Sequence, residues 1–396
     1  MNSIKEVSLK GKRVLVRVDF NVPLDEKQSI TDDSRMIAAL PTIKKIITDG
    51  GMAIVLSHLG RPKNRYEQKF SLKHIVGHFS KLIGKTVSFS NDCLGEKTSR
   101  NVKNMRNGDI LILENLRFYK QEVDGDVDFA KELSQLGDVY INDAFGTAHR
   151  AHASTSIIAR FFPKNKYFGF LLEKELASLE TVLKKPKRPL TAIIGGAKIT
   201  GKIDVVRSLF DKVDNLIIGG GMAYTFAKAM GGEVGKSLVE HEKVELAMGL
   251  IKEAKKRGVN LLLPIDSINA DVFSNNANTS TTNILVIKND YIGLDIGKKS
   301  VDKFCSVILS SKTIVWNGPM GVFEMKSFES GTKKIGEAVC LATERGAFSL
   351  VGGGDSIAAV KKFNFEDRLS YVSTGGGAML EYLEGRCLPG VSAILD

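Results

Sequence analysis

The stretch NLIIGGGMAYTF, Asn215–Phe226, contains the pattern that decides the fold. A short run of aliphatic residues ends in three glycines, and the glycines lead into residues with a helical pattern. A strand, a glycine turn and a helix in this order are typical of α/β proteins. No polar residue interrupts the aliphatic run, which predicts a strand covered on both faces, as in a parallel sheet.

Similar runs recur along the chain, with helical patterns between them. We therefore predict an α/β fold with parallel β-sheets covered by helices. The expected strands are Arg13–Val18, Met52–Leu56, Thr86–Phe89, Asp109–Leu113 and Val139–Ile141 in the first half, and Thr191–Ile194, Asn215–Ile218, Asn260–Leu263, Thr313–Trp316, Ser349–Val351 and Ser370–Ser373 in the second.

The length of 396 residues is too great for one small core, so we expect two domains. Phe170–Leu183, FLLEKELASLETVL, has helical apolar spacing and precedes the basic, proline-containing KKPKRP of Lys184–Pro189. We interpret this region as a linking helix. One domain then covers residues 1–170, the helix and linker cover 171–189, and a second domain begins at residue 190.

The composition is that of an ordinary globular protein, with 43% hydrophobic and 26% charged residues. No apolar run reaches the length of about 18 residues that a membrane span needs. The N-terminal MNSIKEVSLKGKR lacks the apolar stretch of a secretory signal, and the four cysteines have no CxxC spacing. We therefore expect a cytoplasmic protein with no membrane partner.

The net charge of +11 lies mostly in the first half, where 27 Lys and Arg face 19 Asp and Glu up to residue 170. Such an excess indicates an anionic partner: a nucleic acid, an acidic surface or a small phosphorylated substrate. A surface charge that only keeps the protein soluble explains a moderate excess equally well. Charge alone does not choose among these alternatives.

Glycine turns follow the strands of the second half, at Gly195-Gly196, Gly219–Gly221, Gly352–Gly354 and Gly375–Gly377. Glycine allows close backbone approach to a ligand, and a following helix offers free N–H groups to phosphate oxygens. In Gly352–Ser356, Asp355 is a candidate Mg²⁺ ligand and Ser356 a candidate hydroxyl donor. Each loop taken alone could equally be a tight turn with a helix cap. Four such loops at one sheet edge favour a nucleotide site.

Two lysines, Lys198 and Lys202, come just after a predicted strand and are spaced to share one helical face. There they would meet a polyphosphate as point charges, unless both are ordinary surface lysines. Two sequences that resemble a P-loop fail its pattern, because the GxxxxGK frame that starts at Gly196 ends in Ile203 and the one that ends in Ser237 is a residue short. GxGxxG is absent as well, which disfavours an NAD enzyme.

The turns after the first-half strands carry charged side chains instead of glycines. They are Asp19, Asn21 and then Arg35 after the first strand, His58 and Arg61 after the second, Arg117 after the fourth, and Arg150 and His152 after the fifth. Taken singly, each Arg is more often a surface ion pair and each His a structural residue. As a set at one sheet edge they predict an anion pocket, because arginine binds carboxylate and phosphate with two parallel hydrogen bonds.

Motifs for covalent catalysis are missing: the chain has no GxSxG, HExxH or protein-kinase HRD and DFG sequences. Positive charge, glycine amides and one candidate metal carboxylate remain. These are the groups that direct phosphoryl transfer uses, because positioning and charge stabilisation dominate that reaction.

Nine motifs in order along nearly the whole chain resemble those of the phosphoglycerate kinase family. They are RVDFNVP (Arg17–Pro23), SHLGRP (Ser57–Pro62), ENLRFY (Glu114–Tyr119), DAFGTAHRAHAST (Asp143–Thr155), GGAK (Gly195–Lys198), GGGMAYTF (Gly219–Phe226), WNGPMGVFE (Trp316–Glu324), GGGDS (Gly352–Ser356) and STGGGAMLE (Ser373–Glu381). The resemblance implies two Rossmann-like domains joined by a helix, with the second domain ending near residue 380 and residues 381–396 returning to the first.

The resemblance also implies an activity: reversible transfer between 1,3-bisphosphoglycerate and MgADP, giving 3-phosphoglycerate and MgATP, by a monomer without nucleic-acid partners. It implies direct in-line transfer after closure of the two domains, with phosphoglycerate bound by the first domain and the nucleotide by the second.

The family's site residues carry over by position. For phosphoglycerate they would be Asp19, Asn21, Arg35, His58, Arg61, Arg117 and Arg150. For the nucleotide they would be Lys198, Lys202, Gly220, Gly221, Gly293, Asn317, Glu324, Gly352, Gly353, Gly354, Asp355 and Ser356, with Asp355 on Mg²⁺. The catalytic groups would be Arg35, Lys198 and the backbone at Gly352 and Gly375.

Three positions depart from the family pattern: Gly201 replaces the usual Asp before Lys202, Lys298 a proline, and Ser267 an apolar residue. A glycine inside a helix costs about 0.5–1 kcal/mol relative to alanine. We therefore expect Gly201 to loosen the presentation of Lys202 and to affect nucleotide affinity.

Two other classes stay open on the residues alone. One is a different two-domain enzyme, such as another small-molecule kinase or a dehydrogenase. The other is a nucleic-acid-binding protein, although the basic residues lie singly at strand ends, without interleaved aromatic residues.

Overall fold

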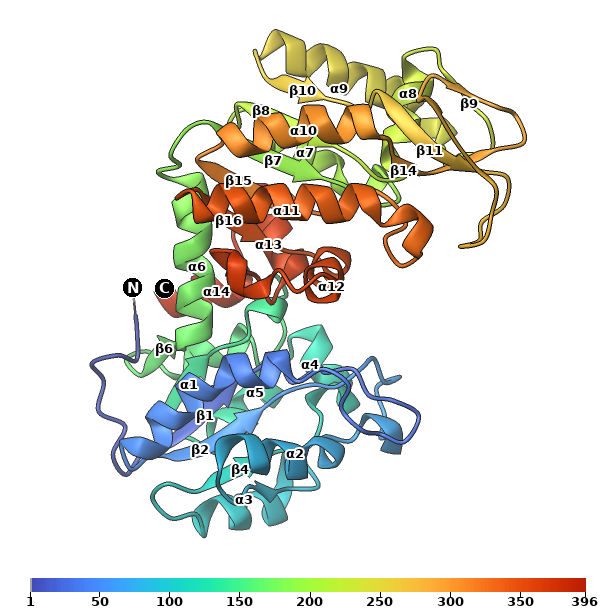
Figure 1. The fold of residues 1–396 in the computed structure, drawn as a ribbon. Helices are drawn as coiled ribbons and strands as arrows, with labels where there is room; N and C mark the ends of the chain where they lie inside the picture. Colours follow the sequence, from blue (N-terminus) through green and yellow to red (C-terminus); the bar gives the residue numbers. More distant parts are fainter. Residues whose placement is uncertain (1) are drawn as a thin grey trace. The chain divides into compact units, whose positions relative to one another are not determined.

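The computed structural model describes residues 2–396, which form two compact units. The first unit contains the residues up to Ala177 together with Cys387–Asp396, and the second contains Ser178–Arg386. The division falls inside helix α6 (Phe170–Leu183), which has the bounds predicted from its apolar spacing (Figure 1). Each unit is an α/β structure, so the predicted fold class is confirmed.

The first unit is built on a six-stranded sheet in the order β3-β4-β2-β1-β5-β6, and every pairing in it is parallel. Its strands are β1 (Arg13–Arg17), β2 (Met52–Leu56), β3 (Ser88–Phe89), β4 (Ile110–Ile112), β5 (Val139–Asn142) and β6 (Lys166–Phe168). The helices include α1 (Ser34–Thr48), α2 (Lys73–Ile83), α3 (Gly95–Lys103), α4 (Lys120–Asp124), α5 (Val127–Ser134) and α14 (Pro389–Leu395).

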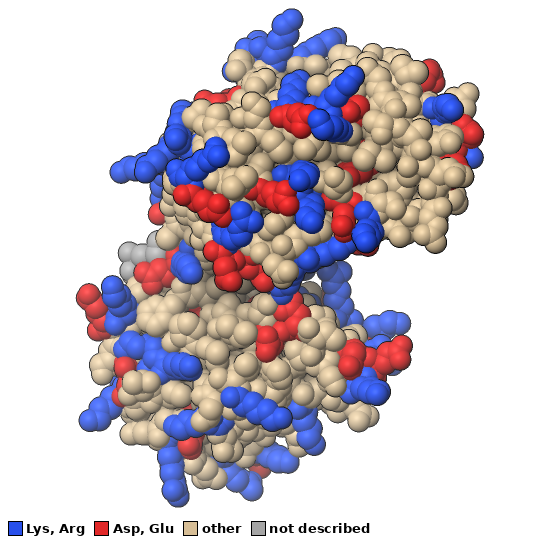
Figure 2. Space-filling view, viewed as in Figure 1, with Lys and Arg blue, Asp and Glu red and all other residues tan. Residues whose placement is uncertain are grey.

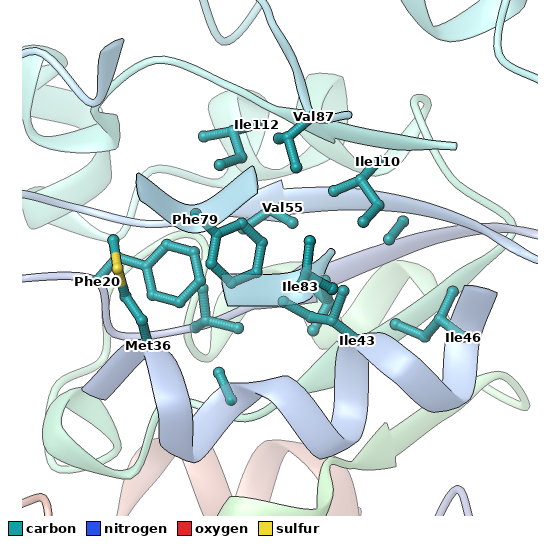
Figure 3. Close-up of a cluster of buried hydrophobic side chains, with 14 of the residues drawn as sticks. Phe20, Met36, Ile43, Ile46, Val55, Phe79, Ile83, Val87, Ile110 and Ile112 are labelled. Atoms are coloured by element: carbon teal, nitrogen blue, oxygen red, sulfur yellow. The ribbon is translucent and has the colours of Figure 1, made fainter. Parts of the chain in front are cut away.

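Helices α1 and α2 cover one face of this sheet. Figure 3 shows Ile43 and Ile46 of α1 and Phe79 of α2 directed at strand residues such as Val55. The buried residues of α1 recur at the spacing of one helical face, which explains why this stretch forms an amphipathic helix. The Phe79 ring lies 4.9 Å from that of Phe20, measured between ring centres. This apolar layer supports the loops that leave the strands at their carboxyl ends.

The C-terminal residues complete the first unit. The Asn142 side chain at the end of β5 donates to Gly390 O over 3.1 Å, and Gly390 N–H donates to Ala148 O over 2.8 Å. Helix α14 is therefore tied to the loop that follows β5.

The second unit repeats the plan with a six-stranded, all-parallel sheet in the order β10-β8-β7-β15-β16-β17. Its strands are β7 (Leu190–Ile194), β8 (Asn215–Ile218), β10 (Asn260–Leu262), β15 (Thr313–Asn317), β16 (Phe348–Val351) and β17 (Tyr371–Val372). Its helices are α7 (Ile203–Leu209), α8 (Met222–Ala229), α9 (Val244–Lys256), α10 (Lys298–Ser310), α11 (Ser330–Glu344), α12 (Gly354–Lys362) and α13 (Gly376–Leu383).

A cluster of buried side chains joins α10 and α11 to one face of the second sheet. It includes Phe304 of α10, Val339 of α11 and Trp316 of β15, all fully buried. Trp316 also donates its indole N–H to Gly318 O over 2.8 Å. The core thus fixes the start of the loop that follows β15.

Every strand predicted from an apolar run overlaps an observed strand. The prediction missed β6 and a second layer of short strands: a three-stranded antiparallel sheet of β12 (Thr279–Asn283), β11 (Asp266–Ala270) and β14 (Ile292–Ile296), and the pair β9 (Glu233–Val234) and β13 (Val286–Ile287). The sequences TSTTN and DSINA carry no apolar run, because β12 is half-exposed and β11 buries polar side chains through hydrogen bonds.

Phe79→Ala should destabilise the first unit by about 3–5 kcal/mol, because it leaves a cavity between α2 and the sheet. Urea unfolding followed by far-UV circular dichroism measures this change. Lys81→Ala, on the exposed side of the same helix, is the matched control and should shift the unfolding free energy by less than about 0.5 kcal/mol. Equal effects of the two variants would contradict the packing described.

Candidate active site

The charged loops of the first unit lie at the carboxyl ends of neighbouring strands. Strands β4, β2, β1 and β5 are adjacent in the sheet and parallel, so the loops that follow them share one edge. These loops carry all of the first-half residues predicted for an anion pocket, with Arg35 contributed by the first turn of α1.

Asp19 and Asn21, which follow β1, hold Arg35 in place. The Asp19 carboxylate forms an ion pair with the Arg35 guanidinium at 3.1 Å, and Arg35 also donates to Asn21 O over 3.0 Å. Asn21 N–H donates to the same carboxylate over 3.1 Å. Two groups therefore fix one edge of the Arg35 guanidinium.

The loop after β2 is joined to its neighbours through Gly60. Its N–H donates to the Asn21 side chain over 2.7 Å, and its carbonyl accepts a hydrogen bond from Arg117 over 2.9 Å. Arg117 belongs to the short 3₁₀ helix η2 (Leu116–Phe118) after β4. Burial, with the nearby charges of Arg17 and Arg150, lowers the pKa of Arg117 to about 10. The guanidinium thus stays charged at neutral pH.

His58 is buried under this edge and is neutral at physiological pH. Burial, together with the charges of Arg17, Arg117 and Arg35, lowers its pKa well below the ordinary value. Its Nδ1 lies 3.3 Å from a terminal nitrogen of Arg17. Because a guanidinium can only donate, Nδ1 must accept here, and the ring hydrogen is left on Nε2.

His152 is buried on the β5 side of the same edge, and burial with the charges of Arg17, Arg117 and Arg150 lowers its pKa to about 3. Its Nδ1 is buried and has no hydrogen-bond partner among residues 2–396. Arg150 and Arg61 are exposed at the rim. The structure therefore gathers Asp19, Asn21, Arg35, His58 and Arg117 by direct contact or through Gly60. Arg150 adds a positive charge that acts on Arg117 and on the neutral His152 ring.

Sequence reasoning missed the polar group beneath this pocket. Arg17, the last residue of β1, is 1% exposed and donates to Ser154 Oγ over 2.9 Å. Ser154 in turn donates to the buried Glu122 carboxylate over 2.6 Å. The available signal was an arginine inside the apolar run RVLVRV, since a charge in a buried strand requires partners.

In the second unit, the loops after β7, β8 and β15 contact each other through their backbones. Gly196 N–H donates to Pro319 O over 3.0 Å, and Gly220 N–H donates to Met320 O over 3.1 Å. A Cβ atom on Gly220 would come within 2.5 Å of Gly196 N, and the φ angle of Gly220 is +68°. Only glycine fits there, so the glycine turn is a requirement of this loop packing.

These loops border a cavity of about 480 Å³. Of the predicted nucleotide residues, Gly220, Gly221, Gly293, Glu324 and Asp355 line it. Its other walls are mostly apolar side chains that the sequence did not single out, namely Tyr224, Leu238, Phe273, Ile292, Leu294, Met320, Val322 and Met325. An apolar cavity with a few polar groups on its rim is the usual form of a small-molecule site.

Lys198 and Lys202 do not share a helical face, so that prediction is wrong. Lys198 lies exposed in the loop after β7, and Lys202 ends the 3₁₀ turn η5 (Thr200–Lys202) that precedes α7. Lys202 Nζ turns back and donates to Gly195 O over 2.5 Å. Burial lowers its pKa to about 8, although the charge of Asp355 opposes the shift. Gly201 lies in η5 and not inside an α-helix, so the predicted helix-interior penalty does not apply.

The loop Gly352–Ser356 is braced by residues that were predicted to bind the nucleotide. Asn317 is buried and its side chain donates to Gly352 O over 2.7 Å, while Ser356 Oγ accepts from Gly318 N–H over 2.6 Å. Neither Asp355 nor Ser356 caps α12, because Gly353 occupies that position. A Cβ atom on Gly376 would lie 2.6 Å from Gly353 Cα, so the loops after β16 and β17 also touch through their backbones. Gly375 immediately precedes this contact as the N-cap of α13.

Asp355 is exposed at the cavity rim, in the first turn of α12. Within residues 2–396 no three His, Cys, Asp or Glu side chains cluster in a way that could enclose a metal ion. A single carboxylate suits a Mg²⁺ ion that arrives with a polyphosphate, because Mg²⁺ keeps several waters and takes its other ligands from phosphate oxygens.

Of the two remaining departures, Lys298 begins α10 on the surface and pairs with Asp302 at 3.3 Å. Ser267 is buried, and its hydroxyl is hydrogen bonded to that of Tyr224 at 2.7 Å. The serine therefore supports a wall of the cavity.

The chain is similar in sequence to the members of one protein family. The phosphoglycerate kinase family profile matches residues 4–386. Phosphoglycerate kinase of Porphyromonas gingivalis is 50% identical, with 99% of each chain covered. Phosphoglycerate kinase of Chlorobium phaeobacteroides is 51% identical, with 100% of this chain and 99% of that protein covered.

Solved structures agree with these relatives. The fold is similar to that of phosphoglycerate kinase from Coxiella burnetii, with a TM-score of 0.89 and 41% identity over 99% of this chain and 98% of that one. It is also similar to phosphoglycerate kinase from Pyrococcus horikoshii OT3, with a TM-score of 0.87 and 30% identity over 100% of this chain and 98% of that one.

Affinity for a nucleoside diphosphate should fall as the pH rises through about 8, because Lys202 then loses the charge that would contact phosphate. Calorimetric titration with MgADP between about pH 7 and 9.5 tests this. Lys202→Arg is the matched variant, since arginine stays charged throughout this range, and its affinity should change little with pH. A wild-type affinity that stays constant above pH 8 would contradict the assignment.

Proposed function

Because the chain belongs to the phosphoglycerate kinase family and is a glycolytic kinase, we propose that it uses the two sites described above to convert 1,3-bisphosphoglycerate and MgADP reversibly into 3-phosphoglycerate and MgATP. One observation carries this assignment: the carboxyl edge of one sheet is lined by Arg and His, and that of the other by glycine loops and an apolar cavity. The first edge suits a small anion and the second a nucleotide.

The phosphoglycerate binds at the edge of the first unit. Asp19 and Asn21 hold Arg35 from one side, which leaves the rest of its guanidinium to meet a phosphate or carboxylate. Neutral His58 offers an Nε2 hydrogen, and charged Arg117 offers further donors. Arg61 and Arg150 complete the set from the rim.

The nucleotide binds in the cavity of the second unit. Its apolar walls suit an adenine ring, and the Glu324 carboxylate on its lining suits a ribose hydroxyl. Lys202 and the amides of the glycine loops, those of Gly353 and Gly354 among them, take the phosphates. Asp355 would hold the Mg²⁺ that the nucleotide carries, which would supply charge neutralisation at the phosphates.

Transfer is direct and in line, without a covalent enzyme intermediate. Arg35 and Lys198 spread the charge of the transferring phosphoryl group. The Gly352 N–H donates to Trp316 O over 3.0 Å and the Gly375 N–H to Ser373 Oγ over 3.3 Å, so these two glycines act by shaping the loops at this edge. Because Arg35 belongs to the first unit and Lys198 to the second, the proposal includes domain closure during turnover. Closure would also keep water away from the acyl phosphate.

The proposal extends to the localisation and the partners of the protein. No helix among residues 2–396 has the length and apolar character to span a membrane. Figure 2 shows Lys and Arg lying singly or in small groups with Asp and Glu among them, so this face has no basic tract for nucleic acid. The proposal is a cytoplasmic monomer with small-molecule substrates.

Arg35→Ala should lower kcat by about 100- to 1,000-fold, since it removes a charge that stabilises the transition state, while MgADP affinity stays unchanged. A coupled assay with 3-phosphoglycerate and MgATP, read through a downstream dehydrogenase, measures turnover. Arg65→Ala, which removes an exposed arginine from the same unit, is the control and should turn over normally. Normal turnover of Arg35→Ala would remove Arg35 from the chemistry.

A further inference from the structure

The segment that carries Lys198 and Lys202 is held at its middle by a residue from a distant part of the chain. The Glu240 carboxylate accepts hydrogen bonds from Ile199 N–H over 2.5 Å, from Thr200 N–H over 3.3 Å and from Thr200 Oγ1 over 2.5 Å. Both carboxylate oxygens are used. One side chain therefore fixes the backbone directly after Lys198.

The Glu240 contacts matter for this segment for two reasons. Ile199 is fully buried, so its N–H would otherwise be left in an apolar setting without a partner. Gly201 has no side chain, and a Cβ atom added there would meet nothing within 4 Å. Lys202 Nζ holds the far end of the segment by donating to Gly195 O. Glu240 fixes the end next to Lys198 through its hydrogen bonds to Ile199 and Thr200.

Glu240 is itself fixed to helix α8. Its backbone N–H donates over 3.1 Å to the hydroxyl of Thr225, a buried residue of that helix. Glu240 also directly precedes the 3₁₀ turn η6 (His241–Lys243), which leads into α9. The packed helices α8 and α9 therefore fix the position of the Glu240 backbone.

The same short segment also borders the nucleotide cavity. The Ser237 hydroxyl accepts a hydrogen bond from Gly293 N–H over 2.9 Å, and Leu238 lines the cavity. Residues 237–240 therefore contact the cavity at one end and the Lys198 segment at the other. Residues 237–240 would therefore support both a ligand in the cavity and the backbone that positions Lys198.

The electrostatics favour a charged carboxylate at this position. Partial burial by itself would raise the pKa of Glu240, but the hydrogen bonds from Thr200 and Ile199 and the charge of Lys198 outweigh it and lower the pKa. An ionised carboxylate is a stronger acceptor than a neutral one, so the three hydrogen bonds are charge-assisted.

We propose that Glu240 is a positioning residue for phosphoryl transfer, which holds the Ile199–Thr200 backbone so that Lys198 is presented to the transferring group. This inference rests on the proposed function of Lys198. Glu240 touches neither substrate in this account and acts only through the Lys198 segment.

The test compares kcat and KM of Glu240→Ala, Glu240→Gln, Glu242→Gln and Lys198→Ala in the coupled assay with 3-phosphoglycerate and MgATP. Glu240→Ala should lower kcat by about tenfold or more, because a displacement of about 1 Å in a catalytic group can cost about 100-fold. Its KM for 3-phosphoglycerate should stay within about twofold, since that substrate binds in the other unit.

Glu240→Gln should recover most of the lost rate, because its amide oxygen still accepts from both N–H groups. Glu242→Gln, which removes an exposed carboxylate two residues away, should match the wild type.

The outcomes separate the inference from the function on which it rests. If Lys198→Ala loses turnover while Glu240→Ala keeps it, the positioning role is wrong and the function of Lys198 stands. If Lys198→Ala itself turns over normally, the proposed function of Lys198 fails. A Glu240→Gln variant as slow as Glu240→Ala, or a raised KM for 3-phosphoglycerate in both, would also overturn the positioning role. If Glu240→Ala does not fold, Thr200→Val decides, because it removes one of the three donors and should lower kcat by a smaller factor at unchanged KM.

Discussion

The close backbone contact among the loops after β7, β8 and β15 is the constraint on which the cavity of the second unit depends. Gly196 and Gly220 donate directly to carbonyls of the loop after β15, and a side chain on Gly220 would force these loops apart. The cavity exists because the loops meet in this way at one end of the sheet. Lys202 depends on the same contact, since its ammonium is held by Gly195 O. One packing requirement thus shapes the cavity and positions the Lys202 ammonium.

The charged edge of the first unit is held in a different way, by a chain of buried polar groups. Arg17 joins Ser154 and the Glu122 carboxylate below the pocket to His58 within it. A buried guanidinium is stable only when its donors are satisfied, and the same donors determine which nitrogen of His58 carries hydrogen. Backbone contacts therefore organise the loops of the second unit, and side-chain charges organise those of the first. The sequence shows the same contrast, because glycine turns follow the strands of the second half and charged turns follow those of the first.

The sequence predicted the strands and the edges well, because uninterrupted apolar runs such as Asn215–Ile218 mark buried parallel strands with little ambiguity. It missed the antiparallel sheet around Asp266–Ala270, where the buried Ser267 hydroxyl is hydrogen bonded to Tyr224, a residue distant in the sequence. It also placed Lys198 and Lys202 on one helix, since periodicity cannot show that a loop and a 3₁₀ turn intervene. Glu240 gave no signal, because its role arises from contacts with residues 40 positions away.

We propose that one unit binds phosphoglycerate and the other the nucleotide. The most direct measurement is an NMR titration of the isotope-labelled protein with 3-phosphoglycerate alone and then with MgADP alone. We expect 3-phosphoglycerate to shift the signals of His58, His152 and the Asn21 amide, and MgADP to shift those of Gly220 and Gly353. Shifts of Gly220 and Gly353 by 3-phosphoglycerate, with His58 and His152 unchanged, would contradict it.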